Sequence, residues 1–156
     1  MNDKFFIILL YILFNKQSTI TNGVYNLLFD NYYLIYHKGY ISTLNYCAYP
    51  KSFFRILRVS GHFDKALYYI EFIKYNLYLS ISKDNELIFS KNKNNNNLNL
   101  WKFIKIEQNV FVIRNYNNCY LAINKSKFIC QNIPKKEAAL IKLNKIYFEE
   151  KVKKVK

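Results

Sequence analysis

Alternating apolar and polar residues recur along most of the chain and predict a series of short β-strands. Three long stretches carry the pattern: "YNLLFDNYYLIYHKGYISTLN" from Tyr25, "YIEFIKYNLYLSISKDNELIFSKN" from Tyr69 and "FVIRNYNNCYLAINKSKFICQN" from Phe111. Successive side chains of a strand point to opposite faces, so this alternation is typical of strands that bury one face. After residue 23 no apolar pattern of helical period continues for three turns. The pattern therefore predicts an all-β protein.

The three stretches also share landmarks in the same order. Each contains a Tyr-Leu pair, then a polar tip, then an apolar pair. The Tyr-Leu pairs are Tyr33-Leu34, Tyr78-Leu79 and Tyr120-Leu121, and the later pairs are Tyr40-Ile41, Leu87-Ile88 and Phe128-Ile129. The three leucines of the first set are 45 and 42 residues apart.

A fourth apolar strand follows each stretch and gives a second landmark. It reads "FRILRV" from Phe54, "WKFIKI" from Trp101 and "IKLNKI" from Ile141, with starting points 47 and 40 residues apart. Two landmarks with nearly the same period indicate three copies of a four-stranded unit. One copy cannot bury its apolar face alone. We therefore expect the Tyr-Leu pairs and the fourth strands to point into a core that all three copies share.

Twelve strands in three copies resemble the β-trefoil fold, over residues 23–150 with repeats at about 23–63, 66–108 and 109–150. A seven-stranded sandwich is the alternative architecture, because alternation alone does not distinguish the two.

Within that fold, the repeats resemble ricin-B-type (R-type) lectins. These carry a Gln-any-Trp motif at the closing strand, and "NLW" places Asn99 and Trp101 there in the second copy. Phe54 and Ile141 replace the tryptophan in the other copies, and we expect Trp101 to be a core residue. The resemblance implies a carbohydrate-binding, lectin-like module.

The sugar-binding aspartate of that family is missing from all three copies. Ile35, Ser80 and Ala122 stand in its place, so the galactose chemistry of the family does not carry over. The second copy alone keeps a polar residue there, Ser80, with Phe89 as a stacking ring and Asn99 nearby. A sugar site needs a flat ring and a few convergent polar groups, which makes these three the candidate site. The alternative is that they are ordinary strand residues.

The first residues contain an apolar run from Phe5 to Phe14 between polar flanks. This run is much shorter than the roughly 20 residues of a membrane-spanning helix, so we interpret residues 1–22 as a signal peptide. A buried first strand or helix is the alternative. The signal peptide predicts a secreted or extracellular protein.

The chain carries a net charge of +14, which predicts attraction to anionic surfaces. Lysines cluster at expected loops and tips, and the basic tail follows at 151–156. The candidate residues for polyanion binding are Lys91, Lys93, Lys125, Lys127, Lys135 and Lys136. Expected partners are heparin-like sulfated glycans or acidic coat and wall proteins; no nucleic-acid recognition motif is present. The alternative is a solvated surface whose lysines reflect an AT-rich genome.

Three cysteines are present, and Cys119 and Cys130 flank the third predicted hairpin. R-type lectins have disulfides in their repeats at comparable places. The resemblance therefore implies a disulfide between Cys119 and Cys130 and leaves Cys47 unpaired. The sequence contains no CxxC pair of the kind that would suggest a zinc site. The acidic residues are scattered, and three glycines leave no Gly-rich phosphate loop. The sequence thus predicts that the protein is not an enzyme and has no catalytic residues and no cofactor.

Three functional hypotheses follow. The first is a secreted lectin-like module; if the composition reflects a microsporidian source, the resemblance implies a spore-wall, polar-tube or host-directed protein. The second is a structural protein that binds acidic partners through its lysine-rich surface. The third is a protease inhibitor of the Kunitz soybean type, which shares the fold, although no exposed inhibitory loop is recognisable.

Overall fold

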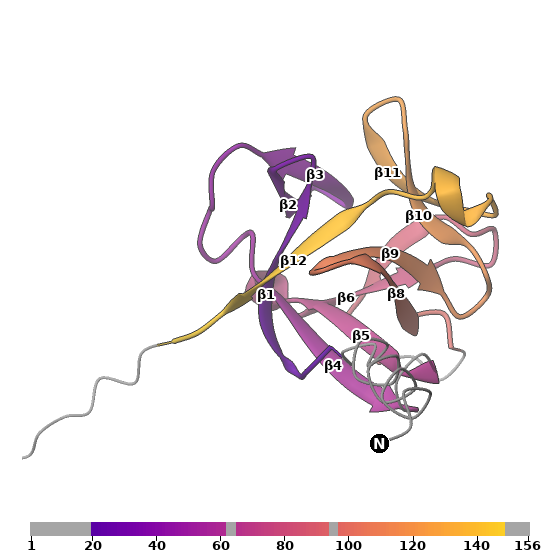
Figure 1. The fold of residues 1–156 in the computed structure, drawn as a ribbon, viewed down its shortest axis with the longest axis horizontal. Coiled ribbons are helices and arrows are strands. Elements are labelled where there is room, and N and C mark those ends of the chain that lie inside the picture. The colour runs from indigo at the N-terminus through magenta and orange to yellow at the C-terminus, as the bar shows by residue number, and fades with distance from the viewer. Residues whose placement is uncertain (1–19, 62–64, 94–96, 149–156) are drawn as a thin grey trace, which may run out of the picture.

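The computed structural model describes residues 20–61, 65–93 and 97–148, and these form three successive groups of four strands (Figure 1). The first group is β1 (Gly23–Phe29), β2 (Tyr32–His37), β3 (Tyr40–Leu44) and β4 (Phe54–Ser60). The second is β5 (Leu67–Phe72), β6 (Leu77–Ile81), β7 (Leu87–Ser90) and β8 (Trp101–Glu107), with the 3-10 helix η2 (Ile73–Tyr75) after β5. The third is β9 (Val110–Asn115), β10 (Tyr120–Asn124), β11 (Lys127–Gln131) and β12 (Ile141–Ile146), with η3 (Lys135–Glu137) before β12.

Two predicted segments fall wholly or largely outside this description. The signal peptide at 1–22 lies outside the described residues except for its last three positions, and so does the whole basic tail at 151–156. In the described part of the chain, no helix has the length and apolar character needed to span a membrane.

The first and last strands of each group build a closed barrel. Antiparallel pairing runs from β1 to β4, β5, β8, β9, β12 and back to β1. The remaining strands form the hairpins β2–β3, β6–β7 and β10–β11, and β11 lies against both β3 and β7. We call these three hairpins the cap. A barrel of six strands capped by three hairpins is the β-trefoil architecture, and it confirms the predicted fold.

The pairing register shows which residues are equivalent in the three repeats. Tyr25 pairs with Phe54, Tyr68 with Trp101 and Phe111 with Ile141. The first strands are therefore related by shifts of 43 residues, and the counterpart of Tyr25 is Tyr68, so the predicted start at Tyr69 was wrong by one. A slip of one residue turns every side chain to the opposite face. Because Tyr68 and Tyr69 are adjacent and identical, the sequence alone does not show which of them is the counterpart of Tyr25.

The core lies where the three repeats meet. Phe54, Trp101 and Ile141, the first residues of the three closing strands, are almost completely buried. Beside them lie the leucines of the Tyr-Leu pairs, Leu34, Leu79 and Leu121.

The tyrosines of these pairs do not share that burial. Tyr33, Tyr78 and Tyr120 are only half-buried, so the prediction that both residues of each pair point inward was wrong for the tyrosine. Adjacent residues of a strand face opposite sides, and only one of the two fits the core.

Asparagine supplies many of the turns that glycine makes in other proteins. Asn31, Asn76 and Asn118 adopt positive φ in the three turns that lead from the first to the second strand of each repeat. Asparagine is one of the few residues with a side chain that enters the left-handed region readily. A chain with only three glycines can therefore still form tight turns.

Candidate functional site

The structure does not form an open sugar site from the three predicted residues. Asn99 is 0% exposed and Ser80 only 3% exposed, so neither offers a polar group to a ligand. Phe89 is half-buried, and its ring packs 4.7 Å from that of Tyr36 and 5.1 Å from that of Phe72. Ser80 and Asn99 belong to the interior because β6 and the segment before β8 are folded against the core. We therefore place the candidate site elsewhere.

A surface cavity of about 370 Å³ lies where the three hairpins of the cap meet. We call it the cap pocket. Each hairpin contributes to its wall: Gly39, Tyr40 and Ile41 come from β2–β3, Asp84, Asn85, Glu86 and Leu87 from the β6–β7 turn, and Phe128, Ile129 and Cys130 from β11. The cavity thus combines an aromatic ring, an apolar wall and two carboxylates.

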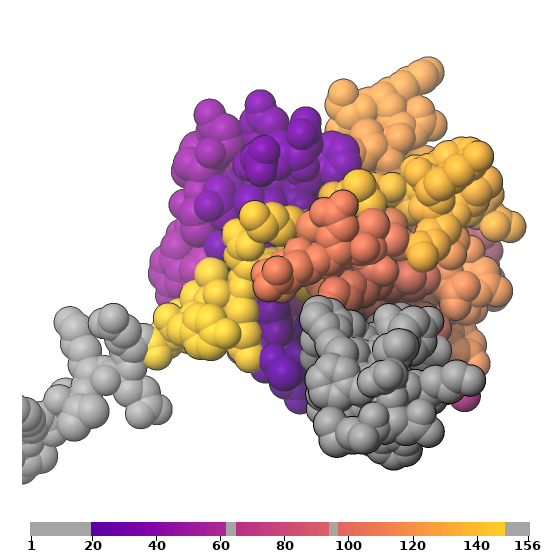
Figure 2. All heavy atoms as spheres, in the orientation of Figure 1, coloured from indigo at the N-terminus to yellow at the C-terminus, as the bar shows by residue number. Residues whose placement is uncertain are grey.

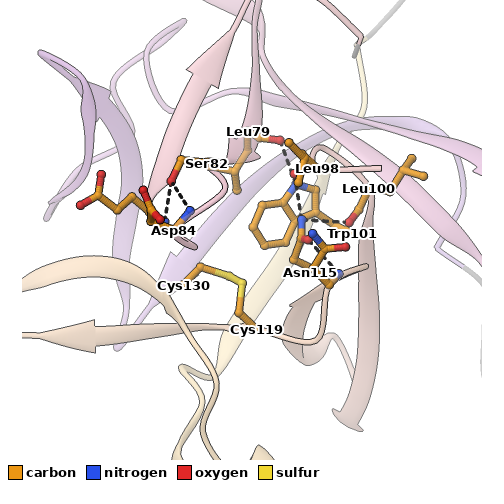
Figure 3. Close-up of a disulfide and its surroundings, with 11 residues drawn as sticks. Leu79, Ser82, Asp84, Leu98, Leu100, Trp101, Asn115, Cys119 and Cys130 are labelled. Atoms are coloured by element: carbon orange, nitrogen blue, oxygen red, sulfur yellow. Dashed lines mark hydrogen bonds between the residues drawn. A yellow bond between two sulfur atoms is a disulfide. The ribbon is translucent and has the colours of Figure 1, made fainter. Parts of the chain in front are cut away.

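Backbone hydrogen bonds fix the turn that carries the two carboxylates. The Ser82 Oγ accepts from the backbone N–H of Asp84 at 3.2 Å and from that of Glu86 at 3.1 Å. The Ser82 N–H donates to the Glu86 carbonyl at 2.8 Å. Figure 3 shows Ser82 and Asp84 at this turn. Within the described residues neither acid takes part in a salt bridge, so both remain available to accept hydrogen bonds from a ligand.

Tyr40 supplies the aromatic ring of the cap pocket. It is 41% exposed, and its ring packs edge-on to His37 with 5.5 Å between the ring centroids. The Lys127 Nζ lies 6.0 Å from the ring centroid. These contacts orient the ring while part of it stays accessible.

A disulfide joins Cys119 and Cys130 beside the cap pocket, with their Cα atoms 5.4 Å apart (Figure 3). Cys130 lines the pocket. The bridge ties β11 to the residue before β10 and so restrains one wall of the cavity. Cys47 is a free, exposed cysteine, and its Sγ lies 3.4 Å from the Ser52 Oγ.

The six lysines predicted to bind polyanions occupy three parts of the surface. Lys125 and Lys127 lie at the tip of the β10–β11 hairpin, whereas Lys135 and Lys136 belong to η3. The other two, Lys91 and Lys93, follow β7, and the Lys93 Nζ lies over the rings of Tyr69 and Tyr78. All six are exposed.

A larger cavity of about 490 Å³ lies at the open end of the barrel, between β1, β12 and the turn after β8. Figure 2 shows the end of β12 (yellow) against this turn (orange-red). The polar groups there already bind one another: the Lys145 Nζ donates to the Thr21 Oγ1 at 2.6 Å, and the Tyr25 hydroxyl donates to the Thr21 carbonyl at 2.7 Å. The cap pocket, with free carboxylates, is the better candidate for a ligand.

Sequence reasoning missed Tyr40, Asp84 and Glu86. A signal was present, because Asp84-Asn85-Glu86 concentrates two acids at one predicted tip of a chain with only ten acidic residues. Its meaning depends on the other two hairpins, which complete the cavity and are distant in the sequence.

Comparison with known proteins identifies the fold of the chain but assigns it to no family. No protein-family model matches the chain, and no curated protein matches it. Among solved structures, a β-trefoil called BEL aligns with a TM-score of 0.67 and 16% identity over 84% of this chain and 99% of that chain. SeviL, bound to the asialo-GM1 saccharide, aligns with a TM-score of 0.64 and 13% identity over 81% of this chain and 100% of that chain.

Two longer proteins contain a similar domain. A Polyporus squamosus lectin, bound to a sialylated influenza-binding epitope, has a TM-score of 0.66 and 14% identity over 82% of this chain, which spans 50% of the lectin. An endo-β-galactosidase of Clostridium perfringens has a TM-score of 0.66 and 10% identity over 81% of this chain, which spans 33% of that enzyme. At these identities the likeness establishes the β-trefoil fold.

Proposed function

We propose that this protein is a non-catalytic, lectin-like module that binds carbohydrate in the cap pocket. The observation that carries the proposal is the convergence of Tyr40, Asp84 and Glu86 from two hairpins, against an apolar wall from the third. Two lectin-type neighbours, one with a bound saccharide and one with a bound sialylated epitope, support this function.

The chemistry of the cap pocket suits a neutral sugar. A sugar ring has an apolar C–H face that packs on an aromatic ring, and hydroxyl groups that donate to carboxylates. Tyr40 offers the ring, and Asp84 and Glu86 offer acceptors for neighbouring hydroxyls. A volume of about 370 Å³ lies in the range of small-molecule sites. The turn carboxylates thereby replace the strand aspartate that this chain lacks.

The sharpest test measures binding to a glycan array and then the affinity for the best neutral sugar by calorimetry. We expect D84N, E86Q and Y40A each to weaken binding at least tenfold while the melting temperature changes little. E107Q is the matched control, because Glu107 is exposed at the end of β8 and lies outside the pocket. Equal affinity of D84N, E86Q and E107Q for the sugar, or no neutral sugar bound by the wild type, would contradict the proposal.

We also propose that the module acts outside the cell. The apolar run after the first residues and the Cys119–Cys130 disulfide support this location, since disulfides persist mainly in oxidising compartments. Expression in a eukaryotic host should release into the medium a chain whose N-terminus lies near residue 23. Retention of the full apolar run, or of the chain inside the cell, would contradict it.

Binding of acidic coat or wall proteins is the second candidate function. A net charge of +14 and exposed lysines on three parts of the surface favour it. Such binding depends on long-range charge and should weaken steeply between low and physiological salt. Neutral-sugar binding in the cap pocket should survive the same change, which separates the two functions.

A further inference from the structure

The three repeats place different residues at one equivalent cross-strand position. Between β4 and β5, Arg55 pairs with Glu71, and the Arg55 Nη1 donates to the Glu71 Oε2 at 2.8 Å. Glu71 is 4% exposed, so this carboxylate is buried and balanced by the guanidinium. The same position between β8 and β9 joins Lys102, the counterpart of Arg55, to Arg114, the counterpart of Glu71.

The exchange of a carboxylate for a guanidinium leaves two cations directly opposite each other. Like charges directly opposite each other on neighbouring strands destabilise a sheet. In the third repeat the equivalent pair is Lys142 with Leu28, which avoids the conflict. The sheet therefore does not require two cations here, and an anion bound beside Lys102 and Arg114 would relieve their repulsion.

A cavity of about 220 Å³ adjoins this pair. We call it the basic pocket. Lys65, Lys102 and Arg114 line it together with Leu67, Asn115 and Tyr116, and none of these lining residues is acidic. Lys102 and Arg114 are half-buried, which reduces the screening of their charges by water. Three cations thus surround one small cavity.

Contacts within the chain position two residues in the wall of the basic pocket, Asn115 and Arg114. The Asn115 amide donates to the carbonyls of Leu98 at 3.0 Å and Leu100 at 3.2 Å (Figure 3). The Arg114 guanidinium carbon lies 6.0 Å from the centroid of the Tyr120 ring, a contact that orients the fork of N–H donors. Two residues of the basic pocket, Arg114 and Asn115, are therefore held in position by contacts within the chain.

We propose that the basic pocket binds the tetrahedral oxyanion of a sulfate or phosphate ester. Bound beside Lys102 and Arg114, the anion would supply the negative charge that the Glu71 carboxylate supplies to Arg55 in the neighbouring repeat. Arginine matches two oxygens of such a group with two parallel N–H donors, and the two lysines add point charges. This proposal goes beyond sugar binding in the cap pocket, because the residues and the ligand chemistry are different.

The decisive variant is R114E, which copies the arrangement of Arg55 and Glu71. It gives Lys102 a carboxylate partner, so it should fold at least as stably as the wild type. K136E is the matched control, with the same change of charge on η3. Calorimetry with a heparin-derived sulfated tetrasaccharide and with mannose 6-phosphate, both in physiological salt, measures binding and separates the two esters as sources of the anion.

We expect R114E to weaken binding of at least one of the two ligands more than tenfold, and K136E to weaken it less than threefold. D84N should leave this binding unchanged, and R114E should leave neutral-sugar binding unchanged, so the two proposals fail independently. Comparable losses in R114E and K136E would show a diffuse charge effect and overturn the proposal. Failure of the wild type to bind either ligand would overturn it as well.

Discussion

Trp101 shows how one residue joins two parts of a repeat. Its side chain is completely buried at the start of β8, and its Nε1 donates to the Leu79 carbonyl of β6 at 2.8 Å (Figure 3). The equivalent residues, Phe54 and Ile141, fill the same layer without a polar atom. The second repeat therefore combines packing with a hydrogen bond between its barrel strand and its hairpin.

Replacing this residue by phenylalanine tests that combination. W101F removes the N–H donor, leaves the Leu79 carbonyl without this bond and opens a small cavity. We expect a loss of about 2–4 kcal/mol in the free energy of unfolding, measured by urea denaturation. Y147F is the control, because Tyr147 is 80% exposed and should change stability by less than about 0.5 kcal/mol. A W101F loss as small as that of Y147F would show that the indole is not a structural anchor.

Tyr68 gives the fold a sensitivity to alkaline pH. Burial raises the pKa of its phenol above the ordinary 10.0, although a backbone hydrogen bond with Ile20 and the charge of Arg58 oppose the shift. The folded chain then keeps this proton at pH values where the unfolded chain loses it. The stabilisation is fully present below about pH 10 and is lost as the pH rises through the folded pKa.

Comparison of the wild type with Y68F isolates this effect. The difference in unfolding free energy between the two should stay constant from pH 7 to pH 9. Above pH 10 the wild type should lose stability faster than Y68F, because only the wild type has a phenol to ionise at this position. Parallel curves up to pH 11 would show that burial does not perturb this group. Urea denaturation followed by circular dichroism gives both curves.

At the scale of the element, the β10–β11 hairpin carries a disulfide and forms one wall of the cap pocket. Its strands pair from Tyr120–Gln131 to Asn124–Lys127, and the disulfide closes it with 11 residues of sequence separation. Closing a loop of this size restricts the unfolded chain by about 2–3 kcal/mol in the chain-entropy model. Because Cys130 also lines the cap pocket, the bridge couples stability to the proposed sugar site.

The double variant C119S/C130S should therefore lose about 2–3 kcal/mol of unfolding free energy and bind neutral sugar more weakly. The affinity should fall through looser packing of β11, which calorimetry measures at a temperature where the variant is still folded. C47S is the control, because it alters only the contact of an exposed thiol with Ser52 and breaks no covalent link; stability should change by less than about 0.5 kcal/mol and sugar binding not at all. Unchanged stability of the double variant would show that hydrogen bonds alone hold the hairpin.

At the scale of the whole molecule, each repeat is completed by its neighbours. β4 of the first repeat pairs with β5 of the second, β8 with β9 of the third, and β12 returns to β1. The Arg55–Glu71 salt bridge therefore links the first two repeats, and the Glu71 carboxylate in it is buried. The Lys102–Arg114 pair occupies the equivalent junction without such a link.

Charge reversal at the two junctions should have opposite effects. E71R places two guanidinium groups opposite each other at a buried position and should cost about 2–4 kcal/mol. R55E combined with E71R restores an ion pair and should recover at least half of that loss. R114E should cost nothing or stabilise by up to about 1 kcal/mol, since this pair is partly exposed. Urea denaturation of the four proteins measures all of these, and equal losses in E71R and R114E would contradict the equivalence of the two junctions.

The sequence by itself determined that the chain is all-β and is built from three repeats. The repeats can be recognised from local sequence patterns alone. These patterns are the leucines Leu34, Leu79 and Leu121 and the closing strands that begin at Phe54, Trp101 and Ile141. Alternation predicts strands because side chains alternate in any β-strand. The period of the landmarks then predicts three units that must bury their apolar faces against one another.

Only the tertiary structure decided which polar residues are accessible and which meet. Ser80 and Asn99 stand at positions that carry polar residues in the lectin pattern, yet both are buried. Tyr40 and Asp84 share a cavity because hairpins from two repeats meet at the cap, and Lys102 and Arg114 oppose each other through the β8–β9 register. Burial and long-range pairing depend on the closure of the whole barrel, and no short stretch of sequence contains that information.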